Sequence, residues 1–174
     1  MNDEIGDYIK DVPDFPKPGV LFKDITPLLA SPKHFRKSVE ALAASAPDGI
    51  DAVVGMEARG FMFAAPVALL LDAAFVPVRK PGKLPGDVYS QSFDLEYGSE
   101  TLTVHRNAID AGARVLVIDD VLATGGTVAA TAGLLRQLGA DLVHVAVVLE
   151  LQQLGGRKLL EEQGIARVTS LVQG

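Results

Sequence analysis

The segment richest in chemistry spans residues 115–127, where two adjacent carboxylates are followed by a Gly-Gly turn bracketed by threonines. Its candidate functional residues are Asp119, Asp120, Ala123, Thr124, Gly125, Gly126 and Thr127. Glycines let backbone N–H groups converge on one anion, and the positive end of a following helix dipole favours negative charge there. Together with the threonine hydroxyls, the pattern predicts a cradle for a single phosphate group.

The two carboxylates beside this cradle suggest a phosphorylated sugar as the ligand. A ribose held by its 5-phosphate would present its 2- and 3-hydroxyls about one sugar away, where Asp119 and Asp120 can accept hydrogen bonds from both. The alternative interpretation is an aspartate turn that caps the helix. The segment lacks the lysine of a Walker A loop, and no G-x-G-x-x-G occurs in the chain, so nucleoside triphosphates and dinucleotides are weaker candidates.

Short β-branched segments alternate with helical ones, which predicts an α/β domain with a mainly parallel, twisted sheet flanked by helices. The expected strands cover residues 51–55, 75–78, 114–118 and 142–149, and the expected helices cover 60–71 and 128–138. Ligands of such sheets bind beyond the carboxyl ends of the strands. Residues 80–101 are rich in Gly and Pro and are expected to form a long flexible loop, a candidate lid.

Length and composition narrow the class of protein. The 174 residues are expected to form one domain, 1–174, and the absence of cysteine excludes disulfides and thiolate metal sites. A net charge of -6 argues against nucleic-acid binding. The longest apolar run, 61–71, is too short to span a bilayer, and the acidic start of the chain is unlike a signal peptide. We therefore expect a soluble cytoplasmic protein without a membrane partner.

Segment 115–127 closely resembles the phosphoribosyl pyrophosphate signature of the type I phosphoribosyltransferases. Four other segments resemble the adenine branch of that family: 14–29, 55–61, 79–86 and 95–98. The resemblance implies the type I phosphoribosyltransferase fold, with an N-terminal base-binding segment (1–35) and a flexible catalytic loop (80–101). It also implies a homodimer that uses Mg²⁺ and converts adenine and phosphoribosyl pyrophosphate into AMP and pyrophosphate in purine salvage.

The resemblance assigns roles to individual residues. Adenine would lie against Leu21, Phe22 and Lys23, with Leu122 or Ala123 opposite, and pyrophosphate would contact Arg59, Arg79 and Lys83. The catalytic residues would be Arg59 and Glu96. Glu96 would be the general base for N9 of adenine or its hydrogen-bond partner, and Tyr97 would be a packing or lid contact. The substrate would hold Mg²⁺, near Asp119 and Asp120, and the Glu57–Ala58 peptide bond would be cis.

Simpler interpretations exist for several of these residues. Leu21 and Phe22 would also suit a hydrophobic core, Arg79 and Lys83 a solvated basic surface, and Glu96 a solvated loop. Two other functions stay open: transfer to another base, such as hypoxanthine or xanthine, and regulation by a protein that senses phosphoribosyl pyrophosphate without turning it over. A regulator would be expected to carry a DNA-binding extension or a basic face, and this acidic chain shows neither.

Overall fold

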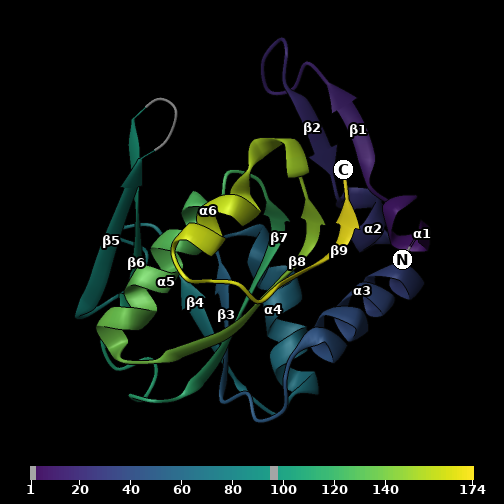
Figure 1. Ribbon diagram of the computed structural model, residues 1–174. Helices are drawn as coiled ribbons and strands as arrows, with labels where there is room; N and C mark the ends of the chain where they lie inside the picture. The colour runs from purple at the N-terminus through teal and green to yellow at the C-terminus, as the bar shows by residue number, and fades with distance from the viewer. Residues whose placement is uncertain (1–2, 95–97) are drawn as a thin grey trace.

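The computed structural model describes residues 3–94 and 98–174 and contains a central five-stranded parallel sheet (Figure 1). The strand order is β4-β3-β7-β8-β9. Its strands are β3 (Ala52–Met56), β4 (Ala74–Val78), β7 (Arg114–Leu122), β8 (Asp141–Glu150) and β9 (Val168–Gln173). The predicted α/β class and the parallel sheet are confirmed.

Alternation along the strands divides the core between the two faces of the sheet. Val115 and Val117 pack into one hydrophobic cluster, with α5 and α6, whereas Leu116 and Ile118 pack into the other, with α3 and α4. The helices are α1 (Asp3–Gly6), α2 (Thr26–Ala30), α3 (Pro32–Ser45), α4 (Arg59–Leu70), α5 (Gly126–Leu138) and α6 (Gly156–Glu162), with a 3₁₀ turn η1 (Gln152–Leu154). Two helical layers therefore hold the sheet between them.

Two antiparallel hairpins lie on opposite sides of the carboxyl edge of this sheet (Figure 1). The first pairs β1 (Lys10–Pro13) with β2 (Leu21–Asp24), and the second pairs β5 (Val88–Asp94) with β6 (Ser99–His105). The second hairpin corrects the interpretation of 80–101 as one long loop. It packs on α5, where Gln91 lies against Gly133 and Phe93 against Gly126.

The sheet also extends further than the sequence patterns indicated. Strand β7 continues to Leu122 because β8 offers backbone partners up to Glu150, so Asp119 and Asp120 lie within the strand. The C-terminal strand β9, which was not predicted, pairs with β8 at the sheet edge. Among the described residues, no helix combines the length and apolar character needed to cross a membrane.

Candidate active site

The candidate site lies at the carboxyl edge of the sheet, as expected for parallel strands. Strands β3, β4 and β7 are adjacent and parallel, so the residues that follow them lie at the same edge. Glu57 to Arg59 follow β3, Arg79 follows β4, and residues 123–127 follow β7. The fold therefore brings together three segments that are separate in the sequence.

The phosphate cradle has the predicted form. Gly125, at the N-cap of α5, has a φ of 86°, a left-handed conformation that favours glycine, and no side chain caps this helix end. A Cβ at Gly125 would lie 2.9 Å from the carbonyl oxygen of Gly156, so the first turn of α6 closes against the cradle. Ala123 and Thr127 are half-buried, whereas Thr124 is exposed. This helix end, with its uncapped N–H groups, is suited to bind an anion.

Asp119 is buried beneath the cradle, against the start of α4. Its Oδ1 accepts a hydrogen bond of 3.0 Å from the backbone N–H of Asp120, and a Cβ at Gly60 would lie 2.8 Å from the same oxygen. Burial, reinforced by the neighbouring Asp120 carboxylate, raises the pKa of Asp119 well above its ordinary value. Asp120 is also buried, and its carboxylate instead faces Arg59.

Arg59 joins Asp120 to the N-terminal segment. Its Nε lies 2.9 Å from Oδ2 of Asp120, and its guanidinium carbon lies 5.4 Å from the centroid of the Phe22 ring. The Asp120 contact is an ion pair without hydrogen-bond alignment, so this buried Oδ2 has no hydrogen-bond partner in the part of the chain that the structure describes. The predicted base, pyrophosphate and ribose contacts thus meet at one arginine.

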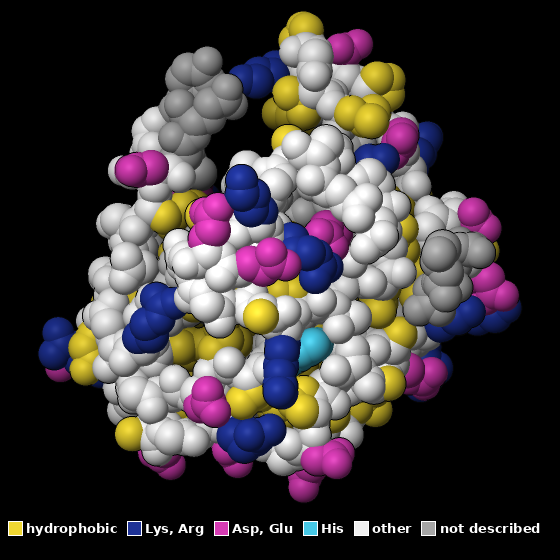
Figure 2. Space-filling view, in the orientation of Figure 1, with side chains coloured by type: hydrophobic (Ala, Val, Ile, Leu, Met, Phe, Trp, Pro, Cys, Tyr) yellow, Lys and Arg dark blue, Asp and Glu magenta, His cyan; other side chains and the backbone are white. Residues whose placement is uncertain are grey.

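The predicted base segment has the expected extended backbone, in β2. Among the described strands, β1 alone pairs with β2, so the opposite edge of β2 leaves backbone N–H and carbonyl groups for a ligand. Lys23 forms a 2.7 Å ion pair with Asp11 across the hairpin. Leu21 is half exposed, and the Phe22 ring packs edge-to-face on Phe15 beside an apolar cavity that Arg59 also lines. Figure 2 shows the apolar side chains gathered on this hairpin beside a hollow in the surface.

The predicted pyrophosphate contacts after β4 have a partner that sequence reasoning missed. The Glu57 carboxylate accepts hydrogen bonds from the backbone N–H of Lys80 and from Nη2 of Arg79, at 3.2 Å for the latter. The Arg79 Nη1 donates to the carbonyl of Lys83, whose side chain is exposed. Glu57 thereby holds Arg79, whose backbone pairs with Thr103 of β6. The only signal in the sequence was an acidic residue two positions before Arg59.

Two further findings concern predicted features. The Glu57–Ala58 peptide bond is cis, as predicted. Glu96 and Tyr97, assigned to the lid, lie outside the described residues.

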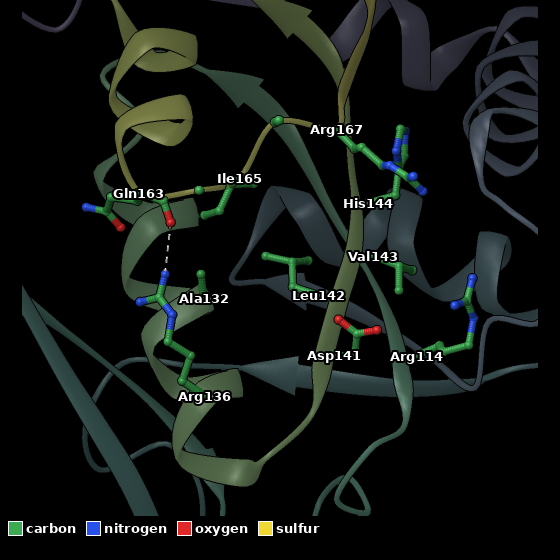
Figure 3. Close-up of a pocket in the computed structure, with 12 residues that line it drawn as sticks. Arg114, Ala132, Arg136, Asp141, Leu142, Val143, His144, Gln163, Ile165 and Arg167 are labelled. Carbon is green, nitrogen blue, oxygen red and sulfur yellow. Dashed lines mark hydrogen bonds between the residues drawn. The ribbon is translucent and has the colours of Figure 1, made fainter.

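A pocket at the opposite, amino edge of the sheet is not part of this site (Figure 3). It lies between α5 and the start of β8, and Arg114, Arg136 and Arg167 are among its lining residues. These cations do not converge: Arg136 donates to the carbonyl of Gln163, and Arg114 donates to the carbonyls of residues 48 and 49. Arg167 lies beside His144 on the other side of the pocket (Figure 3).

Comparisons with known proteins agree with this geometry. A family model described as phosphoribosyl transferase domain matches residues 24–171. The chain is 62% identical over 170 residues to the adenine phosphoribosyltransferase of Cutibacterium acnes, covering 98% of this chain and 96% of the relative. It is 53% identical over 162 residues to the enzyme of that name from Yersinia pseudotuberculosis, covering 92% and 87%.

Solved structures show the same likeness. The crystal structure of adenine phosphoribosyltransferase from Thermoanaerobacter pseudethanolicus superposes with a TM-score of 0.95 at 44% identity, covering all of both chains. The enzyme from Saccharomyces cerevisiae, crystallised with adenine and an iminoaltritol bisphosphate, has a TM-score of 0.90 at 40% identity and covers 97% of each chain.

Proposed function

We propose that this chain, which belongs to the adenine phosphoribosyltransferase family, joins adenine to the ribose 5-phosphate of phosphoribosyl pyrophosphate, forming AMP and pyrophosphate in purine salvage. The observation that carries the proposal is the double contact of Arg59 with Asp120 and Phe22. The Arg59 guanidinium thus lies between Asp120, predicted to bind the ribose, and Phe22, predicted to contact the base. The yeast relative, solved with adenine and a bisphosphate, supports the same pairing of ligands.

The proposed mechanism assigns a part of the substrate to each group. The 5-phosphate binds the backbone N–H groups of the cradle, and the ribose hydroxyls donate to Asp120, whose Oδ2 lacks a hydrogen-bond partner, and to Asp119. Displacement of pyrophosphate passes through an oxocarbenium-like state, as glycoside cleavage does. Arg59, Arg79 and Lys83 neutralise the departing pyrophosphate, which lowers the barrier by electrostatic stabilisation.

Mg²⁺ fits this arrangement as a companion of the substrate. Among the described residues, no group of three or more His, Asp or Glu side chains is arranged to hold a metal ion. Asp119 and Asp120 are the carboxylates beside the phosphate cradle that would assist in holding it. When bound, the ion would supply positive charge to the phosphate oxygens.

Adenine specificity is proposed to come from the backbone of β2. An extended strand edge offers a carbonyl to the exocyclic amine and an N–H to a ring nitrogen. Hypoxanthine replaces that amine by a carbonyl and would leave buried polar groups unpaired, which can cost ~10⁴-fold in specificity. Pyrophosphate release should therefore be measured with phosphoribosyl pyrophosphate, Mg²⁺ and a panel of adenine, hypoxanthine, guanine and xanthine. Comparable turnover of hypoxanthine, or no turnover with any base, would contradict the proposal.

Glu96 is proposed as the general base that accepts the N9 proton of adenine, an assignment that depends on the sequence alone. The Glu96→Gln variant keeps the shape of the side chain and removes its basicity. Positioned acid–base groups contribute ~10²–10⁴-fold, so turnover should fall by that order while the affinity for phosphoribosyl pyrophosphate changes little. Single-turnover rates with near-normal values in this variant would exclude Glu96 as the base.

We also propose a homodimer, with α4 at the interface. Leu69 is 84% exposed and Leu70 56% exposed, and both line an apolar groove between α3 and α4. Exposed apolar groups concentrated on one helix are typical of protein–protein interfaces. The cytoplasmic location stays a prediction.

A further inference from the structure

Behind the phosphate cradle, the mechanism above leaves unused an ion pair between a buried carboxylate and a half-buried arginine. Glu150, at the end of β8, is 3% exposed, and Arg157 follows Gly156 in the first turn of α6. Nη2 of Arg157 lies 2.5 Å from Oε2 of Glu150, and Nε lies 2.8 Å from Oε1, so the contact is bidentate.

The same pair also fixes β9. Nη1 of Arg157 donates to the carbonyl of Val168 at 2.9 Å, and the Ser170 hydroxyl donates to Oε2 of Glu150 at 2.8 Å. The hydrogen bond from Arg157 holds the pKa of Glu150 below its ordinary value, so this carboxylate stays charged at neutral pH. Arg157 therefore links the carboxyl end of β8 and the amino end of β9 to the start of α6.

The residue before this arginine contacts the cradle directly. A Cβ at Gly156 would collide with the carbonyl oxygen of Ala123 and would lie 3.0 Å from the backbone nitrogen of Gly125. Leu122, the last residue of β7, lies opposite Glu150 in the sheet register, and its carbonyl accepts the N–H of Leu151. The backbone of the cradle is thus confined between β8 and α6.

We infer that Glu150 and Arg157 are positioning residues for the 5-phosphate: their ion pair presses Gly156 against residues 123–125 and so keeps the N–H groups of the cradle directed at one point. The inference rests on the proposed function, because it names what prepares the cradle for that substrate. Neither side chain touches the substrate. Their effect is confined to the affinity for ligands that carry the phosphate.

The test measures binding of ribose 5-phosphate and, separately, of adenine to the full chain by titration calorimetry. Arg157→Lys keeps the positive charge, so Glu150 is not left unpaired, but an ammonium cannot reproduce the bidentate contact together with the bond to Val168. Arg167→Lys is the matched control, because the Arg167 side chain makes no hydrogen bond or ion pair with the described residues. Circular dichroism verifies that each variant is folded at the temperature used.

Arg157→Lys is expected to weaken ribose 5-phosphate about tenfold and to leave adenine within twofold of the wild type. In steady state, KM for phosphoribosyl pyrophosphate should rise while kcat is maintained, the sign of lost ground-state binding. Gly156→Ala keeps the ion pair but displaces the cradle, so it should show the same selective loss. If Arg157→Lys does not fold, Glu150→Gln weakens the same ion pair from the other side and decides the matter.

Normal ribose 5-phosphate affinity in the folded Arg157→Lys protein would overturn the inference, even if its melting temperature fell. An equal loss for adenine would also overturn it, since the effect would not be specific to the cradle. Failure of the wild type to bind ribose 5-phosphate would instead contradict the proposed function itself, which separates the two failures.

Discussion

Arg59 shows how one side chain can link two parts of the site that the sequence presents separately. Its guanidinium reaches the Asp120 carboxylate and the face of Phe22 from the first turn of α4. A planar, delocalised cation can pair with a carboxylate and stack on a ring at once, whereas an ammonium group is a compact point charge. The choice of arginine therefore matters beyond its charge.

Replacing Arg59 by lysine is expected to lower kcat/KM for phosphoribosyl pyrophosphate about a hundredfold. The reason is that a lysine ammonium would not place its N–H donors where the guanidinium stabilises the departing pyrophosphate. Initial rates at saturating adenine measure this. The matched control is Arg106→Lys, since Arg106 also stacks on an aromatic ring, that of Tyr89 at 5.0 Å, beyond the end of β6. A loss below threefold in the Arg59 variant, or an equal loss in the control, would contradict the role of Arg59.

Asp119 offers a second prediction, on stability and pH. Because burial raises its folded-state pKa above the unfolded value of about 3.9, the folded protein binds a proton over a range where the unfolded chain does not. Folding stability from this group therefore falls as pH rises from about 4 through the raised pKa. Asp119→Asn does not titrate, so its free energy of unfolding relative to wild type should increase with pH. Urea unfolding without ligand at pH 5, 6, 7 and 8 measures the difference, and a difference that is constant across this range would contradict the burial effect.

At the scale of elements, the sequence predicted what depends on local pattern. Short β-branched segments predicted β3 and β8, and Gly139, with a φ of 73°, caps α5 directly after the expected helix 128–138. The β5–β6 hairpin was missed because its strands, VYSQSFD and SETLTVH, are polar and lie among turn residues. Their pairing depends on packing against α5, a tertiary contact that no local pattern contains.

The features of the site also divide into those that local sequence predicted and those that it did not. The cradle was predictable because its glycines and threonines act through backbone geometry that is local in the sequence. The Glu57–Arg79 ion pair and the Glu150–Arg157 pair were not, because each joins the ends of different elements that only the sheet topology brings together. Burial of a charged group depends on the whole fold, so the burial of Asp119 and Asp120 could not be predicted beforehand.

A prediction for the cradle loop concerns Gly125. Gly125→Ala combines a strained positive φ with a Cβ 2.9 Å from the carbonyl of Gly156, so the loop must move. KM for phosphoribosyl pyrophosphate should rise at least tenfold, measured by initial rates. Gly164→Ala is the matched control, with a φ of 80° and open space around its Cβ. It should lose about 1 kcal/mol of stability without a change in KM. If KM rose equally in both variants, the strained positive φ, and not the contact with Gly156, would explain the rise.

At the scale of the whole molecule, the proposed substrate sites and the proposed assembly surface are separate. The cradle and the base segment lie at the carboxyl edge of the sheet, whereas the exposed leucines of α4 lie near the end of that helix. Because α4 begins at Arg59, an interface on the outer face of α4 would restrict the movement of the helix that positions this arginine. Assembly and activity are therefore expected to be coupled through α4.

The dimer prediction tests this surface. Each buried leucine side chain contributes ~1.5–3 kcal/mol, and a symmetric interface would contain four of them, two from each chain. Leu69→Glu with Leu70→Glu should therefore weaken dimerisation about 10³-fold or more, so that light scattering after gel filtration gives the mass of a monomer at micromolar concentration. Leu154→Glu is the control, since Leu154 is 46% exposed in η1, outside α4, and should leave the wild-type dimer intact. A monomeric wild type would refute the proposed assembly, and a double variant that stays dimeric would move the interface away from α4.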